Sequence, residues 1–106
     1  MRLRAMRIIV FFDLPILTKT ERNQYSKFRK YLMEHGFIMV QESVYSKIAL
    51  NNTATEKMMV GLRKNKPKTG NVQVLTVTER QYQNIEFLIG EPQKEVLDSV
   101  DRLVIY

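Results

Sequence analysis

A single carboxylate at the end of an apolar stretch is the group in this sequence best placed to do chemistry. Residues 6–12 are apolar apart from Arg7, Asp13 follows them, and Pro15 stops the extended run. A carboxylate at the tip of a buried strand is held rigidly and still meets solvent, which suits a hard cation such as magnesium. Because such a cation takes several oxygen ligands, Asp13 needs water, backbone carbonyls, phosphate or a second copy of itself. The last alternative predicts a dimer.

Other candidate groups for catalysis are few. The one histidine, His35, has no carboxylate or second histidine at ligand spacing, so we interpret it as a residue that stabilises a helix end. Ser43 and Tyr45 either orient water or phosphate, or simply pack in a sheet. For Asp13 itself, the alternative is an ordinary turn residue after a strand. Asp13 is therefore the main candidate for both catalysis and Mg²⁺ binding.

Positive charge dominates the first two thirds of the sequence. The formal net charge of +6 favours a polyanionic partner and is also compatible with plain solubility. The alternative to phosphate contact is that these cations form solvated surfaces of a helix and a loop. Acidic residues outnumber basic ones from Glu79 onward, so this tail is expected to contact protein. The candidate DNA-binding residues are Arg22, Lys27, Arg29, Lys30, Lys64, Lys66 and Lys68.

Composition limits the class of protein. A chain of 106 residues is expected to form one core. The absence of cysteine excludes disulfides and cysteine-ligated zinc, and it fits a reducing cytoplasm. No apolar run approaches the length of a membrane span, and the short run after the basic start lacks a small-residue cleavage site. We expect a cytoplasmic protein with no membrane partner.

Two capping-box patterns mark where helices begin. Thr18 and Glu21 have the required spacing, which predicts a helix from about residue 19 to the glycine at position 36. Thr53 and Glu56 repeat the spacing and predict a second helix through about residue 64. The buried stripe of the first helix is expected to contain Tyr25, Phe28, Tyr31 and Leu32.

Strands account for most of the remaining sequence. Residues 37–41 and 43–50 are rich in β-branched and aromatic residues, with a bend or bulge at Gln41 and Glu42. Residues 72–77 predict a further buried strand, followed by a helical turn and a short strand at 85–89. A terminal apolar strand without a partner in its own chain comprises Arg102, Leu103, Val104, Ile105 and Tyr106.

The order of these elements predicts an α+β fold. Strand, helix, strand, strand, helix, strand is the ferredoxin-like βαββαβ arrangement, with both helices on one face of an antiparallel sheet. We divide the chain into a ferredoxin-like domain, 1–90, and a C-terminal segment, 91–106, for dimer and partner contacts. An unpaired apolar strand invites edge pairing, so residues 102–106 are predicted to pair with the sheet of a second protomer.

The chain closely resembles the CRISPR-associated protein two family in residues 6–15, 25–32, 36–39 and 41–47, and the resemblance continues nearly to the end of the chain. In detail it is most similar to members from Cas9-type (type II-A) systems. The resemblance implies a ferredoxin-like homodimer that bridges two dimers of the CRISPR integrase and captures short duplex DNA for insertion into a CRISPR array. It also implies that Asp13 corresponds to the family's proposed magnesium ligand, facing its copy across the dimer axis.

Three functions remain as alternatives. We favour a non-catalytic DNA-binding scaffold, because in the integration complex that the resemblance implies, cutting and joining belong to the integrase. The second is a magnesium-dependent endonuclease of RNA or double-stranded DNA that uses Asp13 from both protomers. The third is a stand-alone, toxin-like ribonuclease of similar fold.

Overall fold

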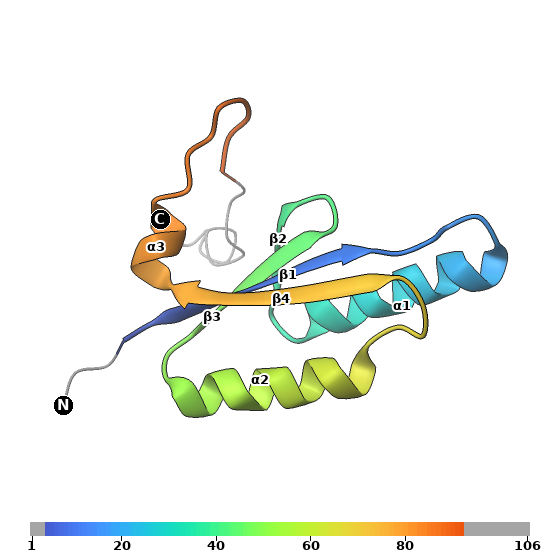
Figure 1. The fold of residues 1–106 in the computed structure, drawn as a ribbon, viewed down its shortest axis with the longest axis horizontal. Helices are drawn as coiled ribbons and strands as arrows, with labels where there is room; N and C mark the ends of the chain where they lie inside the picture. The colour runs from blue at the N-terminus through green and yellow to red at the C-terminus, as the bar shows by residue number, and fades with distance from the viewer. Residues whose placement is uncertain (1–3, 93–106) are drawn as a thin grey trace, which may run out of the picture.

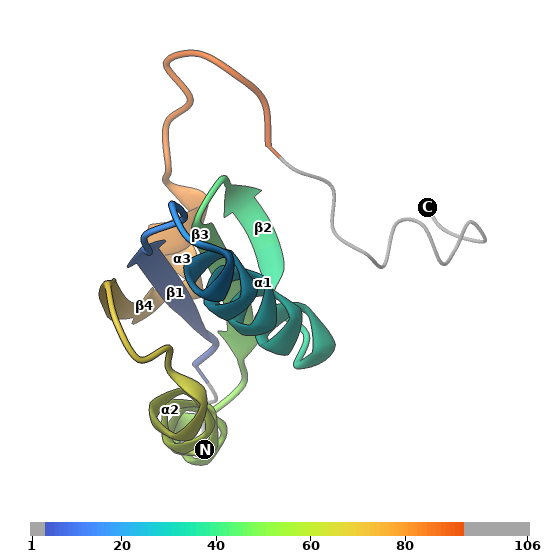
Figure 2. The same cartoon turned by 90° about the vertical axis from the view of Figure 1, so that its right-hand side faces the viewer.

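A four-stranded antiparallel sheet with the strand order β2-β3-β1-β4 organises the protein. The computed structural model describes residues 4–92. Helices α1 and α2 lie on one side of this sheet (Figures 1 and 2). This arrangement confirms the α+β, ferredoxin-like prediction. The elements are β1 (Met6–Asp13), α1 (Lys19–Glu34), β2 (Ile38–Gln41), β3 (Val44–Ala49), α2 (Asn52–Asn65), β4 (Asn71–Thr78) and α3 (Glu79–Gln83).

Alternation along β1 builds the core. Ile8, Val10 and Phe12 are buried and belong to one apolar cluster with residues of both helices. The Phe12 ring meets the Phe28 ring edge-on at 5.3 Å between centroids, and the Tyr45 ring lies 5.8 Å from it. Burying each such side chain contributes about 1.5–3 kcal/mol. The predicted stripe of α1 is therefore confirmed as core.

Side-chain caps fix the first residues of α1 and α2, and the cap of α2 differs from the prediction. Thr18 and Glu21 form the predicted capping box of α1. In contrast, the capping box predicted at Thr53 and Glu56 is wrong, because α2 already begins at Asn52. The extended Asn51 is its N-cap, and the Asn51 Oδ1 accepts a hydrogen bond of 2.8 Å from the backbone N–H of Ala54.

The second half of the sequence departs from the prediction after β4. The bulge predicted near Gln41 is confirmed by a register shift between Met39 and Gln41. The short strand predicted at 85–89 is wrong, because α3 turns the chain away from the sheet before those residues are reached (Figure 1). The predicted strand from Arg102 to Tyr106 lies outside the described residues. Within residues 4–92, no helix has the length and apolarity needed to cross a membrane.

The face of the sheet opposite α1 and α2, here called the open face, is largely apolar. Side chains of alternate β1 residues point to it, together with their cross-strand neighbours on β3 and β4. Phe11, Ile48 and Leu75 are 37%, 40% and 52% exposed there. Among the described residues, α3 covers one end of this face through contacts made with Arg7.

Candidate metal site and nucleic-acid interface

Three connections meet at the end of the sheet where Asp13 lies, here called the Asp13 end. The β1–α1 loop follows Asp13 directly, and the α2–β4 loop arrives beside it because Asp13 pairs with Asn71 at the start of β4 (Figure 1). The β2–β3 turn joins them, since the backbone N–H of Phe12 donates to the Ser43 carbonyl at 3.0 Å. The Asp13 side chain is exposed at this junction.

Gly70 permits the close packing of two of these connections. Its φ is +91°, and a Cβ there would lie 2.7 Å from Leu14 Cδ2 and 2.9 Å from the Asp13 carbonyl oxygen. A side chain at this position would therefore clash with the backbone that carries Asp13 and would also favour another φ. The glycine is what lets the α2–β4 loop lie against the end of β1.

A cavity of about 390 Å³ opens beside Asp13. Glu42 and Ser43 of the β2–β3 turn form one side, where the Ser43 Oγ lies 3.1 Å from the Tyr25 hydroxyl. Arg22 forms another side, and its guanidinium donates to the carbonyls of the β1–α1 loop. Glu42 was missed as a site residue in the sequence because it was interpreted only as part of a bend. Pairing the two strands through a two-residue turn would have placed it there.

The donor atoms around this cavity suit a hard cation, although a single chain supplies few of them. Asp13 and Glu42 offer carboxylates, and Ser43 offers a hydroxyl, so the set consists of oxygen atoms, as Mg²⁺ prefers. Between residues 4 and 92, no group of three or more His, Cys, Asp or Glu side chains is positioned to hold a metal. Water, phosphate or a second protomer would have to complete such a site.

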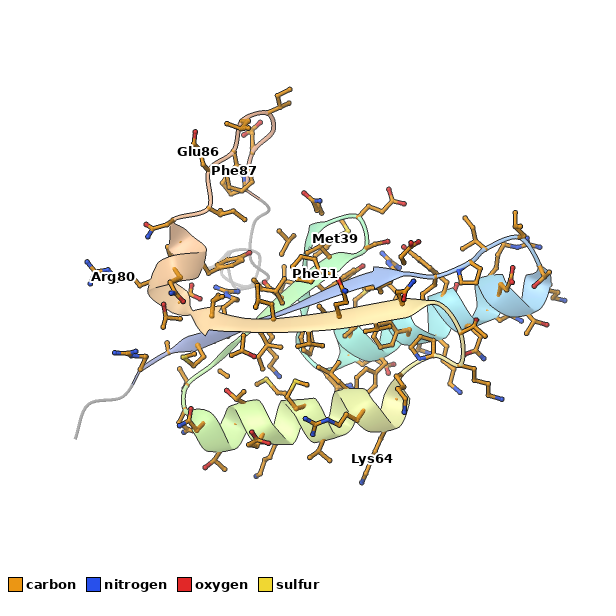
Figure 3. All side chains as sticks on the ribbon, viewed as in Figure 1. Phe11, Met39, Lys64, Arg80, Glu86 and Phe87 are labelled. Carbon is orange, nitrogen blue, oxygen red and sulfur yellow. The ribbon has the colours of Figure 1, made fainter. Side chains whose placement is uncertain are left out.

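Only some of the predicted DNA-binding residues gather at the Asp13 end. Arg22 lines the cavity, and Lys66 and Lys68 belong to the α2–β4 loop. Lys64 occupies the last turn of α2, and its side chain points away from the sheet (Figure 3). Arg22 of α1 and the two lysines of the α2–β4 loop therefore place positive charge at the same end of the sheet as one exposed carboxylate.

The other three predicted cations lie further along α1. Arg29 donates its Nε–H to the hydroxyl of the buried Tyr45 at 2.8 Å, so part of its hydrogen-bonding capacity serves the core. Lys30 lies 4.0 Å from Glu34 one turn later, in an exposed pair of little energetic weight. Lys27 is exposed. Sequence proximity had grouped these residues with Arg22, but the helix carries them away from Asp13.

Comparison with known proteins identifies the family. The profile of the family described as CRISPR associated protein Cas2 matches residues 6–85, which include Asp13 and most of the described fold. This chain is a Cas2 family protein. A CRISPR-associated endoribonuclease Cas2 of Treponema denticola is 54% identical over 100 residues, covering 94% of this chain and 99% of the relative. A relative with the same description in Streptococcus mutans serotype c (strain UA159) is 50% identical and covers 93% of this chain and 91% of its own length. Another in Ligilactobacillus salivarius is 43% identical and covers 94% of this chain and 99% of its own length.

The other candidates for catalysis, besides Asp13, have different surroundings in this Cas2 family fold. Tyr45 is 2% exposed and packs in the core, so the packing interpretation holds for it. Ser43 instead faces the cavity at the Asp13 end. His35 caps the C-terminus of α1, with its Nδ1 2.9 Å from the Tyr31 carbonyl oxygen. It lies at the helix end that the structural interpretation predicted.

An ion pair that the sequence did not reveal attaches α3 to the open face. Arg7 is 5% exposed and makes two hydrogen bonds to the Glu79 carboxylate, of 2.7 and 2.6 Å. Its guanidinium also lies 4.2 Å from the centre of the Tyr82 ring and 3.3 Å from the Ser46 hydroxyl. The hydrogen bonds from Arg7 hold the pKa of the Glu79 carboxyl below its usual range, against the opposing effect of burial. The signal in the sequence was a lone cation within the apolar run of β1.

Proposed function

We propose that this Cas2 family protein is a homodimeric, DNA-binding scaffold of CRISPR spacer acquisition that bridges two dimers of the integrase. The observation that carries the proposal is the balance of charges at the Asp13 end. Arg22 of α1 lines the same cavity as the exposed Asp13 and Glu42, and Lys66 and Lys68 belong to the α2–β4 loop at the same end of the sheet. Such cations bind phosphates of any sequence. This arrangement favours binding of a duplex over its cleavage. Cleavage normally needs more metal ligands or a base.

A second copy of the chain is the partner that we propose for the open face. Phe11, Ile48 and Leu75 give this face an exposed apolar surface, and isolated soluble domains rarely leave such surfaces uncovered. The segment after α3 adds Leu88 and Ile89, which are 86% and 94% exposed on a loop that extends from the body (Figures 1 and 3). A symmetric dimer would bury both surfaces at once. The acidic C-terminal segment would remain for the integrase.

A magnesium-dependent endoribonuclease is the second candidate. The relatives are described as endoribonucleases, and the oxygen atoms of the Asp13 cavity suit a divalent cation. Magnesium, when bound, would supply a metal-activated water for attack on a phosphodiester. In this chain Asp13 and Glu42 would hold the ion, and Arg22 would neutralise charge on the phosphate.

Substitution of Asp13 separates the two functions. For the scaffold, Asp13→Ala leaves spacer acquisition in cells unchanged, whereas Lys66→Glu with Lys68→Glu abolishes retention of a short DNA duplex by the purified chain mixed with its integrase. Lys57→Glu with Arg80→Glu makes the same change in net charge away from the Asp13 end and serves as the control. If Asp13→Ala stops acquisition while folding and co-assembly are normal, the scaffold proposal is wrong. Metal-dependent cleavage of RNA that Asp13→Ala removes would instead support the endoribonuclease.

A further inference from the structure

Ser43 has a backbone conformation that its side chain disfavours. Its φ is +65°, which makes it the one residue other than glycine with a positive φ between residues 4 and 92. It is the second residue of the two-residue turn between β2 and β3, where glycine or asparagine usually lies. Strained residues of this kind concentrate at functional sites. The presence of serine therefore points to a use for its hydroxyl.

The Ser43 side chain is held in the cavity at the Asp13 end. Its hydroxyl lies 3.1 Å from that of Tyr25 on α1, while its carbonyl accepts a hydrogen bond from the Phe12 N–H on β1. The turn is thus fixed to the central strand and to the helix. Glycine in the same turn would keep the backbone bond and would lose the hydroxyl pair.

Arg22 is positioned on another side of the same cavity. One terminal nitrogen, Nη1, donates to the carbonyl oxygens of Ile16 and Leu17 at 3.2 and 2.9 Å. These bonds orient the planar guanidinium before any ligand arrives, which lowers the entropic cost of binding. A guanidinium and two hydroxyl-bearing side chains that line one cavity are a set of groups that suits phosphate oxygens.

Size and charge narrow the ligand further. A cavity of about 390 Å³ has the size of a small-molecule site and admits one nucleotide, not a duplex. Leu14 and Ile16 give it an apolar wall for a sugar or base. Asp13 and Glu42 also line it and repel a bare phosphate, so binding is expected to need a divalent cation.

We propose that Ser43, Tyr25 and Arg22 form a pocket, next to Asp13 in each protomer, for the phosphate of one nucleotide at the end of a DNA or RNA strand. The inference rests on the proposed nucleic-acid binding function and names the chemical group that the Asp13 end recognises. The three residues bind and position this phosphate. No bond is made or broken by them.

The test measures binding of a 5′-phosphorylated trithymidylate to the full-length protein by titration calorimetry with Mg²⁺. Ser43→Gly should unfold at the same or a higher temperature, because it relieves the backbone, and should bind the probe about threefold to tenfold more weakly through loss of one hydrogen bond. Tyr25→Phe should act in the same direction. The same trinucleotide without its 5′-phosphate should bind wild type more weakly than the phosphorylated probe binds either variant, because all contacts to that phosphate are lost at once.

A matched pair of charge variants tests Arg22. Arg22→Gln and Lys57→Gln each remove one positive charge, but Lys57 lies on α2 outside this cavity. Arg22→Gln should weaken binding tenfold or more, since a charged hydrogen bond is lost, whereas Lys57→Gln should change it less than twofold. Equal losses in the two variants would show that only overall charge matters and would overturn the pocket.

Two results separate this inference from the proposed function. If Ser43→Gly binds the probe as tightly as wild type, the hydroxyl has no part in ligand binding and the inference is wrong. If wild type fails to bind the probe yet still assembles with its integrase and a short duplex, the pocket is refuted and the scaffold stands. Binding of the probe without such assembly would refute the scaffold alone.

Discussion

Removal of the Glu79 carboxylate should destabilise the fold strongly, although it lies far from the Asp13 end. Arg7 and Glu79 side chains are 6% and 20% exposed and share two short hydrogen bonds. Leaving one member of a buried pair uncompensated costs about 3–5 kcal/mol. Because Glu79 is partly exposed, water can replace some of its contacts, and we expect about 2–3 kcal/mol for Glu79→Ala. For a domain of this size, that lowers the melting temperature by roughly 10–20 °C.

Thermal and urea denaturation followed by circular dichroism would measure this change. Arg80→Ala, an exposed substitution on the same short helix, is the control and should change the free energy of unfolding by less than about 0.5 kcal/mol. The double variant Arg7→Met with Glu79→Leu should recover most of the loss, because an apolar pair of similar size needs no charge compensation. A loss below about 0.5 kcal/mol for Glu79→Ala, or additive losses in the double variant, would refute the argument that the pair is coupled and buried.

Substitutions of Glu79, Gly70 and Phe11 should have distinct effects. The folded-state pKa of Glu79 is lowered from 4.5, so the stability contributed by its ionised form is present above that value. This contribution is lost as pH falls through the lower folded pKa. The difference in the free energy of unfolding between wild type and Glu79→Gln, measured by urea titration, should therefore shrink from pH 6 to pH 3. Gly70→Ala should cost about 2 kcal/mol or more in the same assay, since it combines a positive φ with a contact to the backbone of Asp13, and an unchanged midpoint would contradict that packing. Phe11→Lys on the open face should convert the proposed dimer to a monomer in analytical ultracentrifugation while leaving the circular dichroism spectrum unchanged, and a persistent dimer would mean that the open face is not the interface.

The parts of the fold that followed from the sequence are those set by local patterns. The apolar alternation of β1 and the Thr18 cap act within a few residues, so their structural outcome needs no knowledge of the rest of the chain. The start of α2 was misplaced because Asn51 and Thr53 are both good caps, and the choice between them depends on where β3 ends. Residues 85–89 have the composition of a strand, but composition does not show whether the chain reaches a sheet edge, and α3 turns it away from the sheet just before them.

The sequence predicted Asp13 as a site residue, but it did not show which residues of other elements line the cavity beside it. Asp13 could be recognised because it ends an apolar strand, which is visible in the sequence alone. Glu42 reaches this cavity from the β2–β3 turn and Arg22 reaches it from α1, so their grouping depends on strand order and register. Arg29 shows that a cation in a basic stretch can also serve the core, since its Nε–H donates to the hydroxyl of the buried Tyr45. Charge counted along a chain does not give charge on a surface.

The position of β1 in the middle of the sheet also has a consequence for how the chain folds. β1 precedes both of its partner strands, β3 and β4, in the chain, and the ion pair between Arg7 and Glu79 spans 72 residues. Contacts of such long sequence separation are slow to form, because the intervening loop must close first. Until β4 is synthesised, the apolar side chains of β1 lack one of their two neighbouring strands. If the ion pair forms after the transition state, its loss will mainly accelerate unfolding and leave the folding rate nearly unchanged.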